Sequence, residues 1–343
     1  MRKHFRTFCR LATTCCLVFA IRPAFAQQEA HSKPRARDLG VPFDGTPGPL
    51  NAITDVAGVT VGHTTLIRGE GKLEIGKGPV RTGVTAVLPR GKDSMMNPAF
   101  AGWWSLPVVA ETWDGYLNDI NGFHVKAEHA FQAIQSAHGG AVEEGAVGGG
   151  TGMICNGFKG GIGTSSRKLD AKDGGYTVGV LVQCNYGSRQ NLRIAGIPVG
   201  REISPEDPYA YQPSEISERG SIIVVVATDA PVLSHQLKRL ARRVSLGLGR
   251  NGSISGDGSG DIFIAFSTAN PHAEGGKTVV DLKFLPNDAL DPIFAATVQA
   301  TEEAIINAMV AAKTMTGIEN HKVIGLPHDR LREVLKKYNR LAP

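Results

Sequence analysis

The sequence has few cysteines, and most of them lie close to its N-terminus. Of the five cysteines, only Cys155 and Cys184 lie beyond residue 16, each within an apolar or glycine-rich stretch. Two cysteines do not make a disulfide framework, so buried free thiols are the favoured interpretation and a disulfide is the alternative. No CxxC pair or Cys/His spacing indicates zinc, and we expect no bound metal.

The sequence also lacks an excess of one charge beyond its first residues. Charged residues make up 20% of the chain, and several of the basic residues behind the net charge of +5 fall in the opening MRKHFRTFCR. The remainder is nearly balanced. This balance gives no electrostatic reason to expect nucleic acid or an anionic membrane as a partner.

The apolar run at the N-terminus is too short for a membrane-spanning helix. LATTCCLVFAI has about 11 residues, whereas a helix needs about 20 to cross the hydrocarbon core. The run follows a basic start and precedes Ala24-Phe25-Ala26, a small-x-small cleavage pattern. Residues 1–26 are therefore predicted to be a signal peptide that is cleaved before Gln27, and the periplasm is the expected destination.

Several nucleotide-binding and hydrolase motifs are missing. The glycine-rich segment VGGGTGMICNGFKGGIGTSS contains no P-loop and no dinucleotide-binding GxGxxG turn. Its glycines are interpreted as allowing tight turns and close backbone packing. The segment GDGSGD at residues 256–261 lacks the closing glutamate of a calcium loop and the spacing of a GxSxG elbow. HExxH is absent as well.

Apolar patterning predicts an α+β fold with stacked sheets. The run IIVVVAT after Ser221 is apolar throughout, so it is expected to be a strand that is covered on both faces. Residues 204–220 contain three prolines and many polar residues, and are expected to form an exposed loop. Other strands are expected at residues 59–64, 83–88, 176–184, 261–267 and 278–285, and helices at residues 126–138, 234–248, 291–317 and after Pro327.

The border between this loop and the strand falls between Gly220 and Ser221. If the chain is cut there, Ser221 carries both a hydroxyl and a free α-amine, and the amine's pKa of about 7.7–8.0 suits it to act as the base for that hydroxyl. Glycine before the cut tolerates strained backbone angles. Because a glycine and a serine at such a border also form ordinary turns, the pattern alone leaves both interpretations open.

Four segments of the chain carry a resemblance to a known family. They are ERGSIIVVVATDAPVLSHQLKRLARRVSLGLGRNGSISGDGSGDIFIAFSTAN, VVAETWDGYLNDINGFHV, GAVGGGTGMICNGFKGGIGTSSR and VLVQCNYG. From about Arg37 to the C-terminus, the chain closely resembles the L-aminopeptidase/D-esterases and β-peptidyl aminopeptidases, the self-processing serine peptidases of family S58. The resemblance implies a four-layer αββα sandwich similar to the N-terminal nucleophile hydrolases but with different connectivity.

The resemblance also implies a cut before Ser221. The products would be an α chain, residues 27–220, and a β chain, residues 221–343, which remain together as one catalytic domain. Such pairs usually assemble into a homo-oligomer, a tetramer of αβ pairs.

The resemblance assigns roles to residues near the cut. Ser221 is the implied nucleophile, and Asn185 matches the residue that donates a hydrogen bond to the oxyanion. Ser259 and Asp261 match the serine and the acid that orient the α-amine and relay protons. Some relatives carry glutamate where Asp261 stands. From the residues alone, Asn185 and Asp261 can equally belong to turns.

The resemblance further implies a substrate pocket beside the nucleophile. Glu111 matches the acid that binds the substrate's N-terminal ammonium, and this acid is expected to be buried. Trp113 and Tyr116 are expected to line the pocket, with Tyr116 as a further candidate oxyanion donor. The implied substrates are short peptides, amides or esters with a free N-terminal amine.

The implied reaction needs neither a metal nor a cofactor, and passes through an acyl-enzyme on Ser221. The sequence leaves open the preference among L-α-, D- and β-aminoacyl substrates. Three alternatives remain: an acyltransferase of the ornithine acetyltransferase type, whose nucleophile is threonine; an unprocessed serine amidase that uses Ser259; and a non-enzymatic periplasmic binding protein.

Overall fold

The computed structural model describes residues 33–91, 107–203, 219–271 and 279–343. The predicted signal peptide, residues 1–26, and most of the predicted exposed loop, residues 204–218, lie outside the described residues. Within the described ranges, no helix combines the length and the apolar character needed to cross a membrane.

A five-stranded sheet forms one of two central layers. Its strands are β5 (Gly161–Lys168), β6 (Thr177–Asn185), β7 (Arg219–Thr228), β8 (Gly258–Ser259) and β9 (Ile262–Ser267). β6 pairs antiparallel with both β5 and β7, whereas β8 and β9 pair parallel with β7. β7 therefore lies between β6 on one side and the β8–β9 segment on the other.

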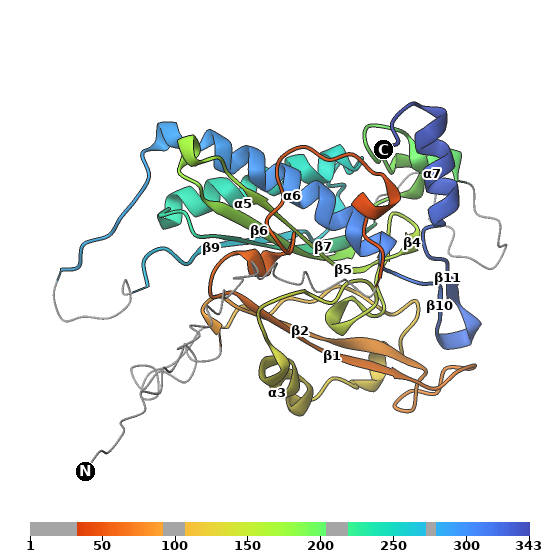
Figure 1. Ribbon diagram of the computed structural model, residues 1–343. Helices are drawn as coiled ribbons and strands as arrows, with labels where there is room; N and C mark the ends of the chain where they lie inside the picture. The colour runs from red at the N-terminus through yellow and green to blue at the C-terminus, as the bar shows by residue number, and fades with distance from the viewer. Residues whose placement is uncertain (1–32, 92–106, 204–218, 272–278) are drawn as a thin grey trace, which may run out of the picture.

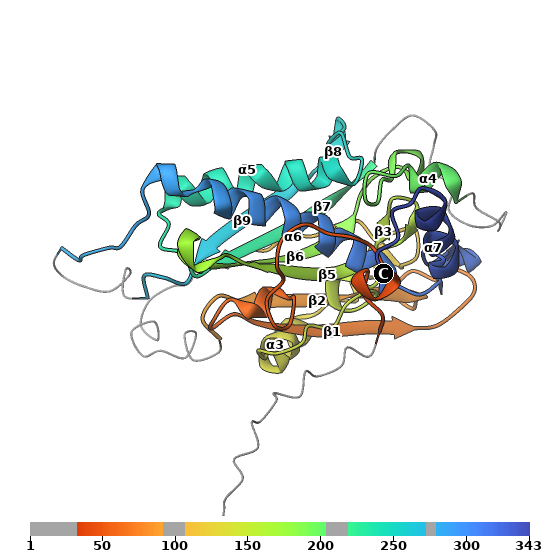
Figure 2. The ribbon, with the colours of Figure 1, turned by 45° about the horizontal axis from the view of Figure 1, so that its top comes forward.

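The second central layer is the antiparallel hairpin of β1 (Thr60–Arg68) and β2 (Val80–Leu88). Helices α5 (Ser234–Arg250) and α6 (Asp291–Val310) cover the outer face of the larger sheet (Figure 1, Figure 2). Helix α3 (Ala127–Ser136) covers the outer face of the hairpin (Figure 1). The order helix, sheet, sheet, helix confirms the predicted four-layer α+β sandwich.

Shorter elements lie around these layers. They are β3 (Ile154–Cys155), β4 (Phe158–Lys159), α4 (Val199–Glu202), β10 (Met315–Thr316), β11 (Lys322–Val323) and α7 (His328–Lys337). Helix α7 confirms the helix predicted after Pro327.

The apolar run of β7 is buried on both faces, as predicted. Ile222 and Val224 enter the core between the larger sheet and helices α5 and α6, whereas Val225 and Ala227 contact the core between the two sheets. Successive side chains of a strand point to opposite faces, so one continuous apolar run serves both cores. Each fully buried Ile or Val contributes about 1.5–3 kcal/mol, which makes β7 a rigid support for the residues at its start.

The glycine-rich segment contains a strand, β5, that the patterning did not predict. Glycine gives a weak strand signal. A Cβ at Gly163 would lie 2.0 Å from the carbonyl oxygen of Ala304 in α6, so only glycine lets the helix pack so closely on the strand. The interpretation of these glycines as allowing close packing is confirmed at this position.

Two predicted elements are wrong. The helix expected to reach residue 317 ends at Val310, because the chain beyond it forms β10, which pairs with β11. The strand expected at residues 278–285 is also wrong, because its described part, residues 279–285, has no regular structure. The N–H of Lys283 donates to the side chain of Asn270, and the N–H of Leu285 donates to the carbonyl of Pro231, so neither joins a sheet ladder.

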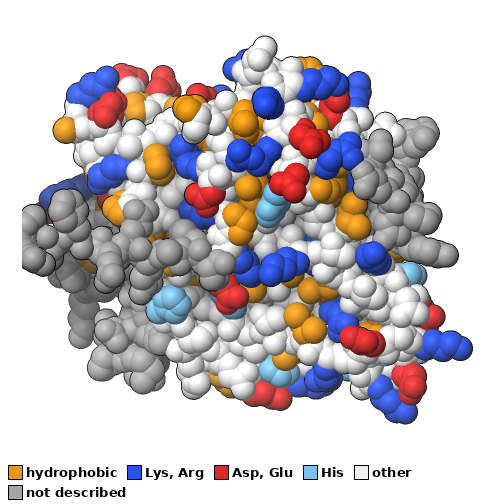
Figure 3. Space-filling view, turned by 45° about the vertical axis from the view of Figure 1, so that its right-hand side comes forward, with side chains coloured by type: hydrophobic (Ala, Val, Ile, Leu, Met, Phe, Trp, Pro, Cys, Tyr) orange, Lys and Arg blue, Asp and Glu red, His pale blue; other side chains and the backbone are white. Residues whose placement is uncertain are grey.

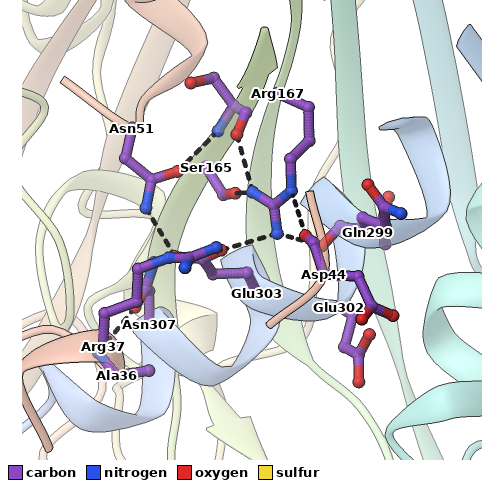
Figure 4. A network of polar contacts seen from close by, with 12 residues as sticks. Ala36, Arg37, Asp44, Asn51, Ser165, Arg167, Gln299, Glu302, Glu303 and Asn307 are labelled. Atoms are coloured by element: carbon purple, nitrogen blue, oxygen red, sulfur yellow. Dashed lines mark hydrogen bonds and ion pairs between the residues drawn. The ribbon is translucent and has the colours of Figure 1, made fainter. Parts of the chain in front are cut away.

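A buried polar network joins the N-terminal segment to α6 (Figure 4). Glu303, which is fully buried, pairs with Arg167 of β5 at 2.7 Å and with Arg37 at 2.8 Å. Burial alone would raise the pKa of Glu303, but the hydrogen bond from Arg37 and the charges of Arg167 and Arg37 lower it below its usual value. The network therefore joins residues that lie on opposite sides of Ser221 in the sequence.

The surface carries no large area of one charge on the face that Figure 3 shows. Basic and acidic side chains are intermixed there, with apolar side chains between them. This distribution fits the nearly balanced charge of the sequence beyond its N-terminus.

Candidate active site

Ser221 lies near the start of β7, between residues of both neighbouring strands. Its partner in the β6–β7 ladder is Asn185, and the partner of Gly220 in the parallel ladder is Ser259 of β8. Side chains of directly opposed residues project from the same face of a sheet, so those of Asn185 and Ser221 lie side by side. The strand begins at Arg219 rather than at Ser221, because Arg219 and Gly220 pair with β8.

Gly220, the residue before the expected cut, occupies a position that requires glycine. Its φ is +98°, in the region that side chains disfavour. A Cβ at this position would lie 2.1 Å from the carbonyl oxygen of Asn185. Both the backbone angle and the close approach of β6 therefore exclude other residues.

The hydroxyl of Ser221 accepts a hydrogen bond from the backbone N–H of Gly260, with Oγ and N 3.0 Å apart. The carboxylate of Asp261 accepts from the N–H of Ile222 at 3.2 Å and from the hydroxyl of Ser255 at 3.4 Å. Asp261 thus lies beside the backbone of Ser221. A negative charge there could orient an α-amine if the chain were cut before Ser221.

Ser259 lies close to the expected cut, and none of the described residues is hydrogen-bonded to its hydroxyl as a base. Its Oγ is buried and has no hydrogen-bond partner among the described residues, while its backbone N–H donates to the carbonyl of Gly256. A serine nucleophile needs an adjacent base. This geometry does not favour the alternative of an unprocessed amidase that uses Ser259.

The side-chain amide of Asn185 has a defined orientation. Its Oδ1 accepts from the N–H of Ile154 at 2.8 Å, and its Nδ2 donates to the carbonyl of Trp113 at 3.0 Å. A backbone N–H only donates and a carbonyl only accepts, so these two partners identify which amide atom is oxygen and which is nitrogen. Because Nδ2 carries two hydrogens, the second can serve an oxyanion beside Ser221.

Cys155 and Cys184 form a disulfide, so the preference for free thiols was wrong. Their Cα atoms are 5.6 Å apart. Both side chains are fully buried, and strand pairing brings the β3–β4 hairpin against the end of β6 in a way that sequence spacing does not reveal. The bond joins the residue after Ile154 to the residue before Asn185, and so supports the Ile154–Asn185 hydrogen bond.

The segment with Glu111 lies beside the end of β6. The side chain of Gln183 donates to the hydroxyl of Thr112 at 2.8 Å, and Trp113 bonds Asn185 as described above. Glu111 itself is exposed, so the expectation of a buried acid at this position is wrong. Next to it, the side chain of Thr112 is buried against Gln183 of β6.

Asp114, three residues after Glu111, is a buried acid that the sequence did not single out. Burial raises the pKa of Asp114; hydrogen bonds from Thr82 and Asn118 oppose this rise, and the charge of Glu111 adds to it. Glu111 therefore lies close enough to influence Asp114 electrostatically. The sequence signal that could have identified Asp114 is its position in AETWDGY, within a segment that carries the family resemblance.

The two aromatic residues of this motif lie in different surroundings. The ring of Trp113 is 59% exposed and lies against Gly115, where a Cβ would fall 2.7 Å from the indole. The ring of Tyr116 stacks on that of His321, with centroids 4.4 Å apart. Trp113 thus meets the site through its carbonyl, which accepts from Asn185, whereas the ring of Tyr116 packs against the C-terminal part of the chain.

Three further groups at this site were not predicted. The N–H groups of Gly260 and Ile154 contact Ser221 and Asn185, and Lys159 lies behind Ile154. A backbone N–H is present in nearly every residue, so the sequence cannot single out such a donor by residue type. All three residues nevertheless lie within segments that carry the family resemblance. Within the described part of the chain, no group of three or more His, Cys, Asp or Glu is arranged to hold a metal ion.

The chain matches a peptidase family and its members. The model of peptidase family S58 matches residues 51–106 and 102–323. The β-peptidyl aminopeptidase BapA of Sphingosinicella microcystinivorans is 52% identical, over 90% of this chain and 93% of the relative. BapA of Sphingosinicella xenopeptidilytica is 45% identical, over 93% and 95% of the two chains.

Solved structures show the same relationship. The L-aminopeptidase D-Ala-esterase/amidase of Ochrobactrum anthropi, described as a prototype of the serine aminopeptidases and a new variant of the Ntn hydrolase fold, superposes with a TM-score of 0.80. It is 42% identical, over 90% of this chain and 100% of that structure. The β-aminopeptidase of a Burkholderia species has a TM-score of 0.78 and 41% identity. This chain therefore belongs to peptidase family S58 and is a hydrolase of peptide bonds.

Proposed function

We propose that this chain is an exported serine aminopeptidase that cuts itself before Ser221 and then uses that residue as its nucleophile. The observation that supports this most strongly is the convergence of three strands at Ser221. β6 contributes Asn185 as its direct cross-strand partner, and the β8–β9 segment contributes Asp261 and the N–H of Gly260. These are the donor, acid and nucleophile that such chemistry requires.

Self-cleavage would proceed through an acyl shift. The Oγ of Ser221 attacks the carbonyl carbon of Gly220 and its proton passes to the departing nitrogen of Ser221, so an ester replaces the peptide bond. Water then hydrolyses the ester, which leaves a carboxylate on Gly220 and a free α-amine on Ser221. The left-handed backbone at Gly220 favours this step, because the strand already holds the bond in an unusual conformation.

Turnover would use the same hydroxyl with a new base. The α-amine of Ser221 takes the proton from Oγ as Oγ attacks the first carbonyl of the substrate, and Nδ2 of Asn185 donates to the oxyanion. The protonated amine then gives its proton to the leaving amine. Water attacks the acyl-enzyme and releases the N-terminal residue as the free acid.

The proposed substrates are short peptides, amides or esters with a free N-terminal amine. Two relatives at 52% and 45% identity are named β-peptidyl aminopeptidases, which favours β-aminoacyl groups over L-α- or D-aminoacyl groups. Glu111 would bind the substrate's ammonium, and its exposure suits it to meet a ligand that arrives from solvent. The buried Asp114 adds negative charge behind it.

The proposed location is the periplasm, and the proposed assembly is a tetramer of αβ pairs. The pattern of residues 1–26 supports export. Large apolar side chains are exposed beside and on α3, among them Phe123 and Phe131 at 75% and 63%. Exposed apolar surface of this kind marks an interface in many proteins. Light scattering on the purified protein measures the assembly.

N-terminal sequencing of the purified protein tests the cut. Denaturing electrophoresis is expected to show two fragments, the smaller beginning SIIVV. Ser221→Ala is expected to remain one chain without turnover, whereas Ser245→Ala, an exposed serine on α5, is expected to be cut and active. An active protein in one intact chain would contradict the proposal. L-, D- and β-aminoacyl p-nitroanilides compared at equal concentration then identify the preferred substrate class.

A further inference from the structure

Lys159, the last residue of β4, is a buried cation without an acidic partner. Its side chain is fully buried, and its ammonium donates to the carbonyls of Met153 at 2.7 Å, Gly160 at 2.8 Å and Gly150 at 3.4 Å. No carboxylate among the described residues lies within ion-pair distance of it. An unpaired charge is unfavourable in a protein interior, so its presence needs a reason.

Closing the β3–β4 hairpin is not that reason, because other bonds already hold it. The disulfide between Cys155 and Cys184 joins the hairpin to β6. The N–H of Gly160 donates to the carbonyl of Met153 at 2.9 Å, and β3 pairs with β4. The carbonyl of Met153 therefore keeps a partner without Lys159.

The ammonium instead contacts one end of a hydrogen-bonded chain that leads to the active site. It bonds the carbonyl of Met153, and the N–H of the same peptide, which belongs to Ile154, donates to Oδ1 of Asn185 at 2.8 Å. Nδ2 of Asn185 lies at the other end of that side-chain amide. The cation is thus connected to the predicted oxyanion donor through two amide groups, the Met153–Ile154 peptide and the side chain of Asn185.

We propose that Lys159 is a positioning residue that strengthens Asn185 as a hydrogen-bond donor to the oxyanion. A positive charge at the Met153 carbonyl polarises the peptide and makes the Ile154 N–H a better donor. That N–H in turn draws electron density from Oδ1 of Asn185, which makes Nδ2–H a better donor. Hydrogen bonds in such chains strengthen one another, by about 10–30% per bond. The inference rests on the proposed function, since it needs an oxyanion beside Ser221.

A pKa of about 7 leaves Lys159 charged in roughly half of the molecules at pH 7 and in a larger share below it. Burial lowers the pKa of Lys159 from 10.5 to about 7. Three carbonyls and no donor surround the amine, an arrangement that suits three N–H groups and leaves no place for a lone pair.

The experiment compares kcat and KM of the wild type with those of Lys159→Met, Lys159→Gln and a control, Thr151→Val. Methionine keeps the length of the side chain but has neither charge nor donor, and glutamine keeps a neutral donor. Thr151→Val removes a buried hydrogen bond from the hydroxyl of Thr151 to the carbonyl of Gly148. That hydrogen bond does not include the Met153–Ile154 peptide. Circular dichroism and melting temperature establish that each variant is folded.

The expected result is a lower kcat at nearly constant KM. Removing a direct oxyanion donor lowers kcat about 100–1000-fold, so an indirect effect of about 10–30-fold is expected for Lys159→Met. Lys159→Gln should lie between Lys159→Met and the wild type, and Thr151→Val should keep the wild-type kcat. A folded Lys159→Met variant that stays uncut also supports the inference, because the carbonyl of Gly220 would need the same donor.

Several results would overturn it. A Lys159→Met variant with kcat within twofold of the wild type, a change confined to KM, or an equal loss of kcat in Thr151→Val would each show that Lys159 is structural. If neither Lys159 variant folds, the side chain is likewise structural. A wild type that lacks the fragment starting at Ser221 would instead refute the proposed function, so the two failures are distinguishable.

Discussion

A buried cation lies near each end of β5, and the two have different partners. Arg167, near the end of the strand, is 1% exposed at its side chain and pairs with the carboxylate of Glu303 at 2.7 Å. Lys159, just before the start of the strand, is equally buried but bonds only backbone carbonyls. The start of β5 pairs with the end of β6, where Asn185 lies, because the two strands are antiparallel. Lys159 therefore lies near the site, and Arg167 lies at the far end of the sheet.

The difference in partners fits a structural role for Arg167 and the proposed polarising role for Lys159. A carboxylate beside Arg167 neutralises it, and the resulting network holds the N-terminal segment, β5 and α6 together (Figure 4). A carboxylate beside Lys159 would cancel the field that reaches Asn185. Stability favours a neutralised pair, whereas polarisation of a donor requires a cation that is left without a counter-ion.

The largest expected effect comes from breaking the paired end. Glu303→Gln leaves Arg167 and Arg37 without their buried counter-charge, and should lower the free energy of unfolding by about 3–5 kcal/mol. Urea unfolding at a fixed protein concentration measures it, because any association between chains makes unfolding depend on concentration. Glu302→Gln, at the adjacent position, where the side chain is 13% exposed and pairs with Arg250, is the matched control and should lose clearly less. Equal losses in the two variants would show that the network does not stabilise the fold.

A smaller effect should distinguish the unpaired end by its pH dependence. The pKa of Lys159 is about 7 when folded and 10.5 ordinarily. Between these values the unfolded chain binds a proton that the folded chain does not, so the free energy of unfolding of the wild type should rise with pH relative to Lys159→Met. Denaturation at about pH 7 and about pH 9.5 measures the difference between the two proteins. A difference that does not change with pH would mean that Lys159 keeps its ordinary pKa in the fold.

The smallest effect is expected from Arg250, a more exposed cation that lies away from the site. Arg250 is 40% exposed at its side chain and pairs with Glu302 at 2.7 Å and Asp44 at 3.2 Å. Arg250→Ala should lower the free energy of unfolding by about 0.2–1 kcal/mol, and less in high salt, because water and ions screen exposed pairs. Thermal unfolding at low and high salt measures this. A loss above about 2 kcal/mol would place Arg250 with the buried network instead.

The sequence predicted the elements whose apolar pattern is strong. The run after Ser221, the helices at α5 and α7 and the strand at β6 all appear where expected, because their patterns reflect burial on one or two faces. β5 was missed, because its glycines serve the packing of α6 and carry no strand signal of their own. The strand expected at residues 278–285 was wrong, because a β-rich pattern without a neighbouring strand has nothing to pair with.

The sequence by itself determined the family and predicted Ser221 as the nucleophile, since both depend on residue types in an unbroken order. Only the tertiary structure decided that Cys155 and Cys184 bond, that Asp114 rather than Glu111 is the buried acid, and that Lys159 contacts the peptide behind Asn185. The physical reason is that these relationships depend on strand register and burial, which bring together residues whose separation along the chain carries no information about their distance in space.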